Sequence, residues 1–411
     1  MIAPLRVAIE ARLISGSSGG TEMVVIGLVA GLSRLTGPEE YLILTTEGQN
    51  DWIRGYVSGP CRLIELPAPD SSTKATTRFL RLAKDLPRLG RVRRVWRKAR
   101  TRPLAPIPTS DGTAERLGVS VIHFPYQRAF RTEIPSIYHP HDLQHVHLPQ
   151  FFGDREREDR DRLFRAFSEQ AQVVAVASDW VKRDVEAHLG LPAAKVKVVP
   201  LAAPIAEYEE LTKEERIGVV KGMGIPGSFL LYPAQTWPHK NHAGLLRAMA
   251  LLRERGIHVH VVFTGRQTAF HRDLLQIQRD LALDDQVSWL GFVSPGELRA
   301  LYQECLAVVV PTFFEAGSFP VFEAFSVGVA VAASSVTSLP EQVGDAGLLF
   351  DPMNDESIAD AIRRLWTDDA LRSELGARGR ARAAPFTWDR VAHEFREIYR
   401  QLASAAVGRR A

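Results

Sequence analysis

Two acidic side chains stand eight residues apart in one short stretch, PTFFEAGSFPVFEAF (residues 311–325). The first, Glu315, follows an apolar run at 306–310 that predicts a buried parallel strand. The second, Glu323, lies inside a predicted helix for which Ser318 is the expected N-cap. The two glutamates therefore flank a helix N-terminus, where free backbone N–H groups favour an anion.

Positive charge is available from two other turns that follow predicted strands in the second half. Lys240 is a point charge suited to a phosphate group, and Arg266, directly after a strand and a glycine, suits one equally. Because the carboxyl ends of parallel strands meet at one edge of a sheet, these turns are expected to converge. The residues expected to bind a phosphate-bearing ligand are Gln235, Lys240, Arg266, Gly317, Ser318, Phe319 and Glu323.

This set of side chains suits the cleavage of a sugar–phosphate bond. Such a cleavage builds negative charge on the departing diphosphate, which cations and N–H donors stabilise, and positive charge at the anomeric carbon, which a carboxylate stabilises. Glu315 lies closer to the reacting end, and Glu323 is suited to accept hydrogen bonds from ribose hydroxyls. No metal is required if Lys240 and Arg266 neutralise the phosphates. Taken singly, each of these residues also has an ordinary explanation as a surface or helix-end charge.

A glycine pair in the first half offers a second approach to a ligand. Gly19 and Gly20 end the loop SGSSGGT (residues 15–21), between a predicted strand at 5–11 and a predicted helix at 22–35. Glycines there let a ligand come close to the backbone. The spacing matches neither GxGxxG nor a P-loop, and an ordinary strand–helix turn explains it equally well.

Residues 134–149 (IPSIYHPHDLQHVHLP) contain four histidines and Asp142 at the end of an apolar run. A strand that reaches into a polar turn is where α/β proteins place active sites, and His141 is the catalytic candidate. A zinc site is the alternative, but the ligand spacing is irregular and neighbouring histidines on an extended segment point to opposite faces. We therefore expect no metal ligands here, and any one histidine has a structural role as its alternative.

The composition describes a soluble two-domain chain. It has 411 residues, 45% apolar and 24% charged, with two cysteines that make a disulfide framework unlikely. No signal-peptide pattern or membrane-spanning run is seen, which predicts a cytoplasmic protein. A formal charge of +3 is too small to indicate nucleic-acid binding. The oligomeric state is left open.

One segment concentrates basic residues. Residues 74–102 hold twelve Lys or Arg against one acid, Asp85, with apolar residues interleaved, inside an insertion at about 70–116. This pattern is typical of a basic amphipathic helix pair on an anionic membrane surface, and a solvated basic face is the alternative.

Short apolar runs alternate with helical patterns through both halves. This order predicts two doubly wound, Rossmann-like domains with parallel sheets, at residues 1–202 and 203–385, joined near 201–204 (LAAP). An amphipathic helix at 386–402 closes the pattern within a terminal segment, 386–411. A ligand would lie between the sheets, where their carboxyl edges face each other.

With these motifs in order, the chain resembles the family 4 glycosyltransferases, which are retaining enzymes of the GT-B fold. Residues 315–323 look like the family's E-x7-E motif, and residues 335–352 look like the segment that follows it. The turns QTWPHKN and PHDLQHVHLPQFF are similar to segments of a subset of bacterial polysaccharide transferases.

The resemblance implies roles for several residues. It places His141 near the transferred sugar, Glu315 on sugar hydroxyls, Glu323 on the ribose, Lys240 on the diphosphate, and Gly19–Gly20 beside the donor. It also implies that the last helix crosses back onto the first domain. Where many members have an arginine, this chain has Gln235, and Arg266 is our hypothesis for its replacement. Ala316, Phe319 and Ala330 also depart from the usual motif.

The expected activity is a retaining, metal-independent transfer of a hexose from a nucleotide-diphosphate sugar. The resemblance favours GDP-mannose as donor, no cofactor, and a glycan or lipid-linked glycan of the bacterial surface as acceptor. It also suggests a peripheral position at the inner membrane face. The alternatives are a nucleotide-sugar 2-epimerase of the same fold and a non-catalytic nucleotide-sugar-binding subunit.

Overall fold

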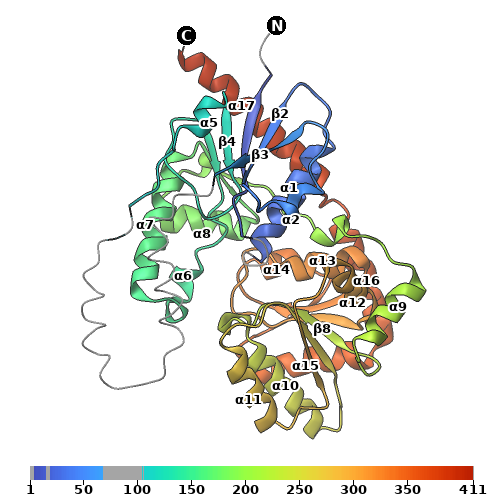
Figure 1. Ribbon diagram of the computed structural model, residues 1–411. Helices are drawn as coiled ribbons and strands as arrows, with labels where there is room; N and C mark the ends of the chain where they lie inside the picture. Colours follow the sequence, from blue (N-terminus) through green and yellow to red (C-terminus); the bar gives the residue numbers. More distant parts are fainter. Residues whose placement is uncertain (1–3, 15–18, 68–103, 105, 411) are drawn as a thin grey trace.

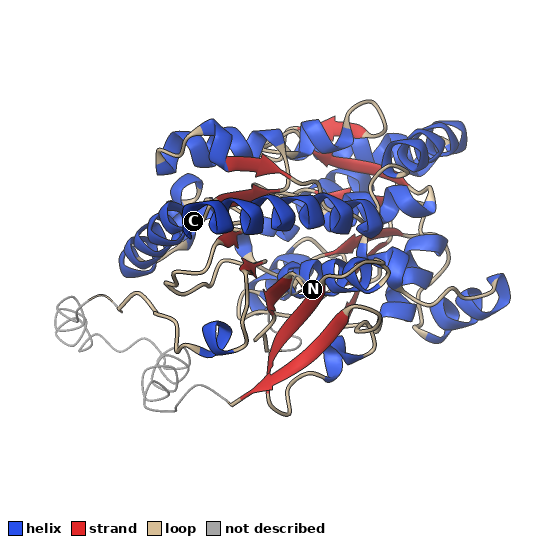
Figure 2. Ribbon diagram, turned by 90° about the horizontal axis from the view of Figure 1, so that it is seen from above, coloured by secondary structure: helices blue, strands red, loops and turns tan. Residues whose placement is uncertain are grey.

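The computed structural model describes residues 4–14, 19–67, 104 and 106–410. It consists of two α/β units, each a parallel sheet with helices on both sides (Figures 1 and 2). This architecture confirms the predicted fold class. The basic segment at 74–102 lies outside the described residues, and the prediction of a membrane-binding helix pair rests on sequence alone.

The first sheet has seven parallel strands in the order β3-β2-β1-β4-β5-β6-β7. Its strands are β1 (Arg6–Glu10), β2 (Glu40–Thr46), β3 (Cys61–Leu66), β4 (Val121–Phe124), β5 (Ser136–Tyr138), β6 (Val173–Val176) and β7 (Val196–Val198). Its helices are α1 (Gly20–Ser33), α2 (Asp51–Arg54), α5 (Thr113–Arg116), α6 (Gln144–His147), η2 (Pro149–Phe151), α7 (Asp154–Gln170), α8 (Asp179–Leu189) and η3 (Ala193–Lys195).

The second sheet has six parallel strands in the order β10-β9-β8-β11-β12-β13. Its strands are β8 (Leu230–Pro233), β9 (Val261–Thr264), β10 (Val287–Gly291), β11 (Ala307–Val310), β12 (Ala330–Ser334) and β13 (Leu348–Phe350). The helices are η4 (Pro204–Glu207), α9 (Lys213–Gly222), η5 (Pro238–Lys240), α10 (His242–Glu254), α11 (His271–Asp280), α12 (Pro295–Glu304), α13 (Phe319–Val327), α14 (Leu339–Val343), α15 (Asp355–Thr367), α16 (Asp369–Ala383) and α17 (Trp388–Arg410).

The central strands are almost wholly apolar because helices cover both faces of each sheet. β11 (AVVV) and β12 (AVAAS) are buried along their whole length. Capping residues begin several helices: Ser294 and Glu297 form a capping box at α12, and Ser178 accepts a hydrogen bond from the third residue of α8. The left-handed Gly328 ends α13.

The last helix, α17, returns to the first sheet and packs along α1 (Figure 1). The indole of Trp388 fills the space that a Cβ at Gly27 would occupy, and Gly31 meets the Trp388 carbonyl. Glu39, which is buried, receives ion pairs from Arg396 and Arg400 of α17. Helix α17 therefore ties the end of the chain to the unit where it begins.

The structure corrects several local expectations. The apolar run at 258–265 forms a strand only over Val261–Thr264, and the helical pattern at 270–283 forms a helix only over His271–Asp280. The edge strands β3 and β13 were missed. No helix among the described residues has both the length and the apolar character to cross a membrane.

Candidate active site

The starts of α1 and α13 approach each other where the two sheets meet. Gly19 has a φ of 53°, and a Cβ there would lie 2.7 Å from the Gln235 amide nitrogen. A Cβ at Gly20 would lie 3.4 Å from the Phe319 ring. The predicted glycine pair of the first unit therefore lies against two predicted donor residues of the second, and any side chain at Gly19 would be strained.

Lys240 and Glu315 form an ion pair, with Nζ and Oε1 2.6 Å apart. Both side chains are largely buried, with exposed fractions of 22% and 12%. The two turns converge as the sequence predicted, but the direct pairing of the two charges was not foreseen. Lys240 and Glu315 neutralise each other here. An incoming anion can therefore take the place of the Glu315 carboxylate on the Lys240 ammonium group.

The turn that carries Lys240 is held rigidly. The Tyr232 hydroxyl donates to the Lys240 carbonyl at 2.8 Å. Asn241, in the left-handed conformation with φ of 55°, caps α10 by accepting from the Gly244 N–H. Its amide nitrogen also donates to the Pro311 carbonyl, which links this turn to the end of β11.

The backbone of Glu315 is fixed by residues from the loop after β12. Its N–H donates to the Thr337 hydroxyl at 3.0 Å, and its carbonyl accepts from Thr337 at 2.6 Å and Ser338 at 2.8 Å. Sequence reasoning included this loop in the family resemblance but assigned Thr337 and Ser338 no role. Their hydroxyl groups hold the carboxylate in place without contacting it.

The N-terminus of α13 differs from the prediction. The Ser318 side chain caps nothing: it is buried and its hydroxyl has no hydrogen-bond partner. Gln342 instead clamps the Ser318 backbone, accepting from its N–H at 2.9 Å and donating to its carbonyl at 2.7 Å. Gly317 packs against Ala177 and Leu201 of the first unit. The Ser318 N–H is thus already bonded, which leaves fewer donors for an anion than expected.

Glu323 is a buried carboxyl, and the alternative of a solvated helix face is wrong. Its side chain accepts a hydrogen bond from the Tyr302 hydroxyl, at 2.5 Å, and the residue is 5% exposed. Burial raises its pKa to about 7, although the Tyr302 hydrogen bond opposes the shift. Glu323 is therefore poised to change protonation near neutral pH. Tyr302, from α12, was not foreseen.

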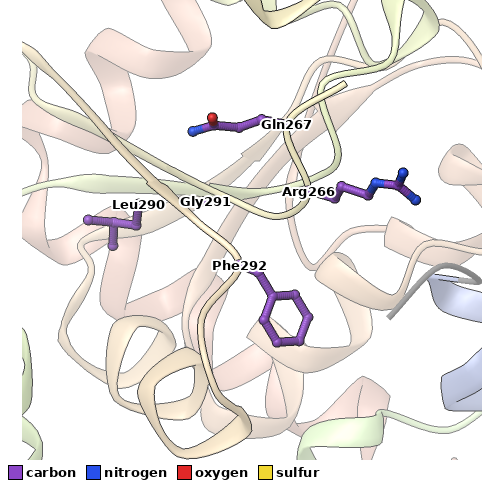
Figure 3. A pocket seen from close by; sticks show the side chains of 5 residues that line it. All are labelled: Arg266, Gln267, Leu290, Gly291 and Phe292. Carbon is purple, nitrogen blue, oxygen red and sulfur yellow. The ribbon is translucent and has the colours of Figure 1, made fainter. Parts of the chain in front are cut away.

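Arg266 lies at the edge of an open hollow of about 460 Å³ that also has Gln267, Leu290, Gly291 and Phe292 in its lining. Figure 3 shows Arg266 extending away from Gln267 and Leu290. The Phe292 ring is 77% exposed, which is unusual for a large apolar side chain. Sequence analysis found Arg266 but missed Phe292, although an aromatic residue directly after the strand end at Gly291 was a usable signal.

His141 is held in a strained backbone conformation, with φ of 61°. Its Nε2 lies 3.0 Å from the Pro125 carbonyl, which can only accept, so Nε2 carries the proton. Burial lowers the pKa of His141, so the ring is neutral and Nδ1 remains an acceptor. His141 stacks near His139, which is hydrogen-bonded to His123, and His123 to Tyr399 of α17.

The other histidines of the segment take different paths. His145 is buried and packs edge-on against Phe164, and neither of its ring nitrogens has a hydrogen-bond partner. His147 pairs with Asp184 on α8. Within the described residues the four histidines and Asp142 do not converge as one ligand set; His147 alone of them meets further potential ligands, Asp184 and His188 of α8.

A second set of contacts joins the two units beside this region. The Glu341 carboxylate accepts from the backbone N–H groups of Asp179 and Trp180, at 2.9 and 3.0 Å, at the start of α8. The Phe314 ring packs against those of Trp180 and His147, with centroids 5.7 and 5.5 Å away. These contacts hold the segment before Glu315 against the first unit.

Two family models match the chain. "Glycosyltransferase Family 4" matches residues 18–206, and "Glycosyl transferases group 1" matches residues 226–382. Among curated proteins, "O-antigen chain mannosyltransferase B" of Escherichia coli is 29% identical over 65% of this chain and 73% of its own length. "Serotype-specific mannosyltransferase WbdA" of Escherichia coli is 30% identical over 44% of this chain, which spans only 22% of that protein.

Solved structures of the same fold cover almost the whole chain. A sucrose-phosphate synthase from Thermosynechococcus elongatus superposes with a TM-score of 0.71 at 19% identity, covering 98% of this chain and all of that one. Anabaena HepE in complex with UDP and glucose superposes with a TM-score of 0.71 at 17% identity, covering 97% of this chain and all of its own. WaaG, a glycosyltransferase involved in lipopolysaccharide biosynthesis, gives a TM-score of 0.62 at 16% identity, covering 96% of this chain and 99% of its own.

Proposed function

Because the chain belongs to the family 4 glycosyltransferases of the GT-B fold, we propose that it transfers mannose from a nucleotide-diphosphate sugar with retention of configuration. The observation that carries this proposal is the largely buried Lys240–Glu315 pair, in the same two turns as Gln235 and Phe319, which approach Gly19 and Gly20. Choice of mannose is supported by the names of the two Escherichia coli relatives.

Donor binding begins with an exchange of partners at Lys240. The diphosphate carries more negative charge than the Glu315 carboxylate and takes its place on the Lys240 ammonium group. Glu315, fixed through its backbone by Thr337 and Ser338, then turns its freed carboxylate to the sugar hydroxyls. The ion pair therefore keeps both groups charged and placed until the donor arrives.

The nucleoside is bound by two other features of the second unit. Glu323 accepts hydrogen bonds from the ribose hydroxyls, an interaction that favours its charged form and opposes the effect of burial. The base stacks on the exposed Phe292 ring in the open hollow, and Arg266 at its edge adds positive charge for the diphosphate. Arg266 thereby compensates for the neutral Gln235.

Transfer proceeds by attack of the acceptor hydroxyl on the face from which the phosphate departs. The bond from the anomeric carbon to the phosphate oxygen breaks, the bond to the acceptor oxygen forms, and the acceptor proton moves to the leaving phosphate. Lys240 and Arg266 stabilise the charge on the diphosphate, so no metal is needed. The His141 Nδ1 accepts a hydrogen bond from a hydroxyl group of the transferred sugar and so orients the sugar. No enzyme nucleophile takes part.

The two units open and close about residues 201–204 so that donor and product can exchange. The acceptor is a glycan or lipid-linked glycan of a bacterial surface polysaccharide, a choice supported by the O-antigen relative. Residues 74–102, outside the described part, would hold the protein at an anionic membrane face.

The test has two stages. A thermal-shift screen of nucleotide sugars comes first, because a ligand that binds only the native state raises the melting temperature, and GDP-mannose is expected to give the largest shift. Transfer to a lipid-linked acceptor is then followed by NMR, with and without EDTA. The expected product keeps the anomeric configuration of the donor in both conditions.

Two results would contradict the proposal. A free nucleotide sugar inverted at C2 would indicate the epimerase. Donor binding with neither transfer to an acceptor nor hydrolysis of the donor would indicate the non-catalytic subunit. If deletion of residues 74–102 causes no loss of liposome binding, the proposed membrane contact is wrong. The proposed transfer chemistry is unaffected by that result.

A further inference from the structure

Three potential metal ligands from two helices meet on the first unit, apart from the donor residues. Asp184 and His188 are four residues apart on α8, so they lie on one face of the helix. His147, at the end of α6, reaches the same place. Its Nε2 lies 2.7 Å from the Asp184 Oδ1, and the Nδ1 of His188 lies 3.1 Å from the same oxygen.

The Asp184 carboxylate is not satisfied by this arrangement. Its side chain is 5% exposed, both imidazoles approach Oδ1, and Oδ2 has no hydrogen-bond partner. The His188 Nδ1 also donates to the Asp184 backbone carbonyl at 2.9 Å, a contact that a bound metal would replace. A buried carboxylate oxygen without a partner is costly and needs an explanation. The second oxygen and the two ring nitrogens are together the donor types of a transition-metal site.

We propose that His147, Asp184 and His188 bind a divalent cation of the zinc class. One ligand atom from each residue can be chosen so that all three lie within 4.8 Å of one another. Zinc takes nitrogen and carboxylate oxygen at about 2.0–2.2 Å, so tetrahedral ligands stand roughly 3.3 Å apart. The spacings of 2.7 and 3.1 Å to Asp184 Oδ1 need to widen slightly, and ligand atoms as far apart as 4.8 Å need to move closer, which the partly exposed imidazoles can do by rotating.

The types of the three metal ligands also indicate which ions the site excludes, and their exposure indicates where a fourth ligand comes from. Two imidazoles and one carboxylate favour zinc over magnesium or calcium, which prefer oxygen ligands. The imidazole side chains remain 30% and 39% exposed, which leaves room for a water molecule in the fourth position.

Such an ion would fix α6 to α8 at the contact between the two units. The His147 ring packs against Trp180 of α8 and against Phe314, the residue before Glu315. Zinc binding would therefore stabilise the surface on which the Glu315 segment rests. Its role is structural, and it replaces none of the cations proposed for the diphosphate.

The experiment uses the full chain without a histidine tag, first dialysed against a chelator. Isothermal titration with ZnCl2 is expected to show one site per chain, and zinc is expected to raise the melting temperature. MgCl2 in place of zinc is expected to do neither. Cobalt(II) in the same site should give the strong visible absorption of tetrahedral coordination.

Two variants locate the site and a third controls for histidine loss. His188→Ala, which leaves the His147–Asp184 contact intact, and Asp184→Asn should each weaken zinc binding at least about tenfold. His258→Ala, an exposed histidine on the second unit, should bind as the wild type does. Melting temperatures without metal report whether each variant is folded.

The proposal is overturned if the wild-type chain binds no zinc at micromolar concentrations. It is equally overturned if folded His188→Ala binds zinc as tightly as the wild type. In either case the three side chains form only a hydrogen-bonded cluster.

Discussion

The two sheet edges that meet at the candidate site handle charge in opposite ways. On the second unit every predicted donor carboxylate has a close partner: Lys240 for Glu315 and Tyr302 for Glu323. On the first unit the facing groups are the uncharged glycine pair and the half-buried His141, whose pKa is lowered by desolvation. The predicted site residues of the second unit are thus charged and paired, and those of the first unit are uncharged.

This difference fits the two ends of the proposed reaction. The leaving diphosphate develops the larger charge, so the second unit needs cations that stay ionised and placed. The sugar and the acceptor hydroxyl need positioning by hydrogen bonds, for which a neutral imidazole is suited. We therefore expect substitutions among the charged residues of the second unit to affect donor binding and turnover, and substitutions at the contact between the units to affect closure.

Removal of the Lys240 charge should have the largest effect. Lys240→Met takes away the partner of the departing diphosphate and leaves Glu315 buried without a counter-charge. We expect kcat/KM for the donor to fall about 1,000-fold. Lys221→Met, at an exposed lysine on α9, should keep wild-type kinetics. Similar kinetics for both variants would show that the charged edge does not act on the donor.

Glu323 should make both stability and donor binding depend on pH. Its folded pKa of about 7 lies above the ordinary 4.5, so its contribution to stability is full below 4.5 and is lost as the pH rises through 7. Glu323→Gln does not titrate, so the wild type should lose about 3 kcal/mol relative to the variant over this range. Urea denaturation at pH 4.5 and pH 8 measures the difference. Donor affinity of the wild type should rise over the same range, because ribose hydroxyls favour the carboxylate.

A flat stability difference between these pH values would show that Glu323 is ionised throughout. Tyr302→Phe is the matched variant, because it removes only the hydroxyl that opposes the shift. The pKa of Glu323 should be higher in this variant than in the wild type, so the fall in stability should begin at the same pH and continue to a higher one.

Local patterns in the sequence were sufficient to predict the architecture and the meeting of the turns. Apolar runs of four or five residues with helical patterns between them specify parallel strands, and the carboxyl ends of such strands share an edge. Lys240 and Glu315 were therefore expected at one place, and the structure puts them in contact. The strand β3 (CRLIEL) was missed because Arg62 and Glu65, three residues apart and exposed at the sheet edge, interrupt its apolar run without giving a two-residue alternation.

The partners that tune the site could not be predicted because they come from distant segments. Tyr302 reaches Glu323 from a helix 21 residues earlier, and Gln342 clamps Ser318 from 24 residues later. Neither residue carries a local signal, since a tyrosine or glutamine in a helix is ordinary. The Ser318 cap failed for the same reason: the distant Gln342 holds the Ser318 backbone N–H and carbonyl, and the buried Ser318 hydroxyl makes no cap hydrogen bond.

Arg266 should have a smaller effect than Lys240 because it is exposed to solvent at the edge of the hollow. Arg266→Ala is expected to raise the donor KM about fivefold with little change in kcat, since one water-screened charge is worth about 1 kcal/mol. Steady-state kinetics with varied donor measure this split. Arg272→Ala, an exposed arginine on α11, is the control. Unchanged donor affinity and turnover in Arg266→Ala would remove the idea that it compensates for Gln235.

Glu341 tests the contact between the units with the smallest expected change. Its carboxylate sits on the first two N–H groups of α8, where a negative charge stabilises the helix end by about 0.3–1 kcal/mol. Glu341→Gln weakens that attraction without touching the donor residues, so we expect the donor KM to rise up to about fivefold and kcat to change less. Glu374→Gln, on the exposed side of α16, should leave KM unchanged. If the melting temperature falls while KM stays constant, Glu341 stabilises the fold but does not contribute to donor binding. A rise in KM at constant melting temperature ties closure of the two sheet edges to donor binding.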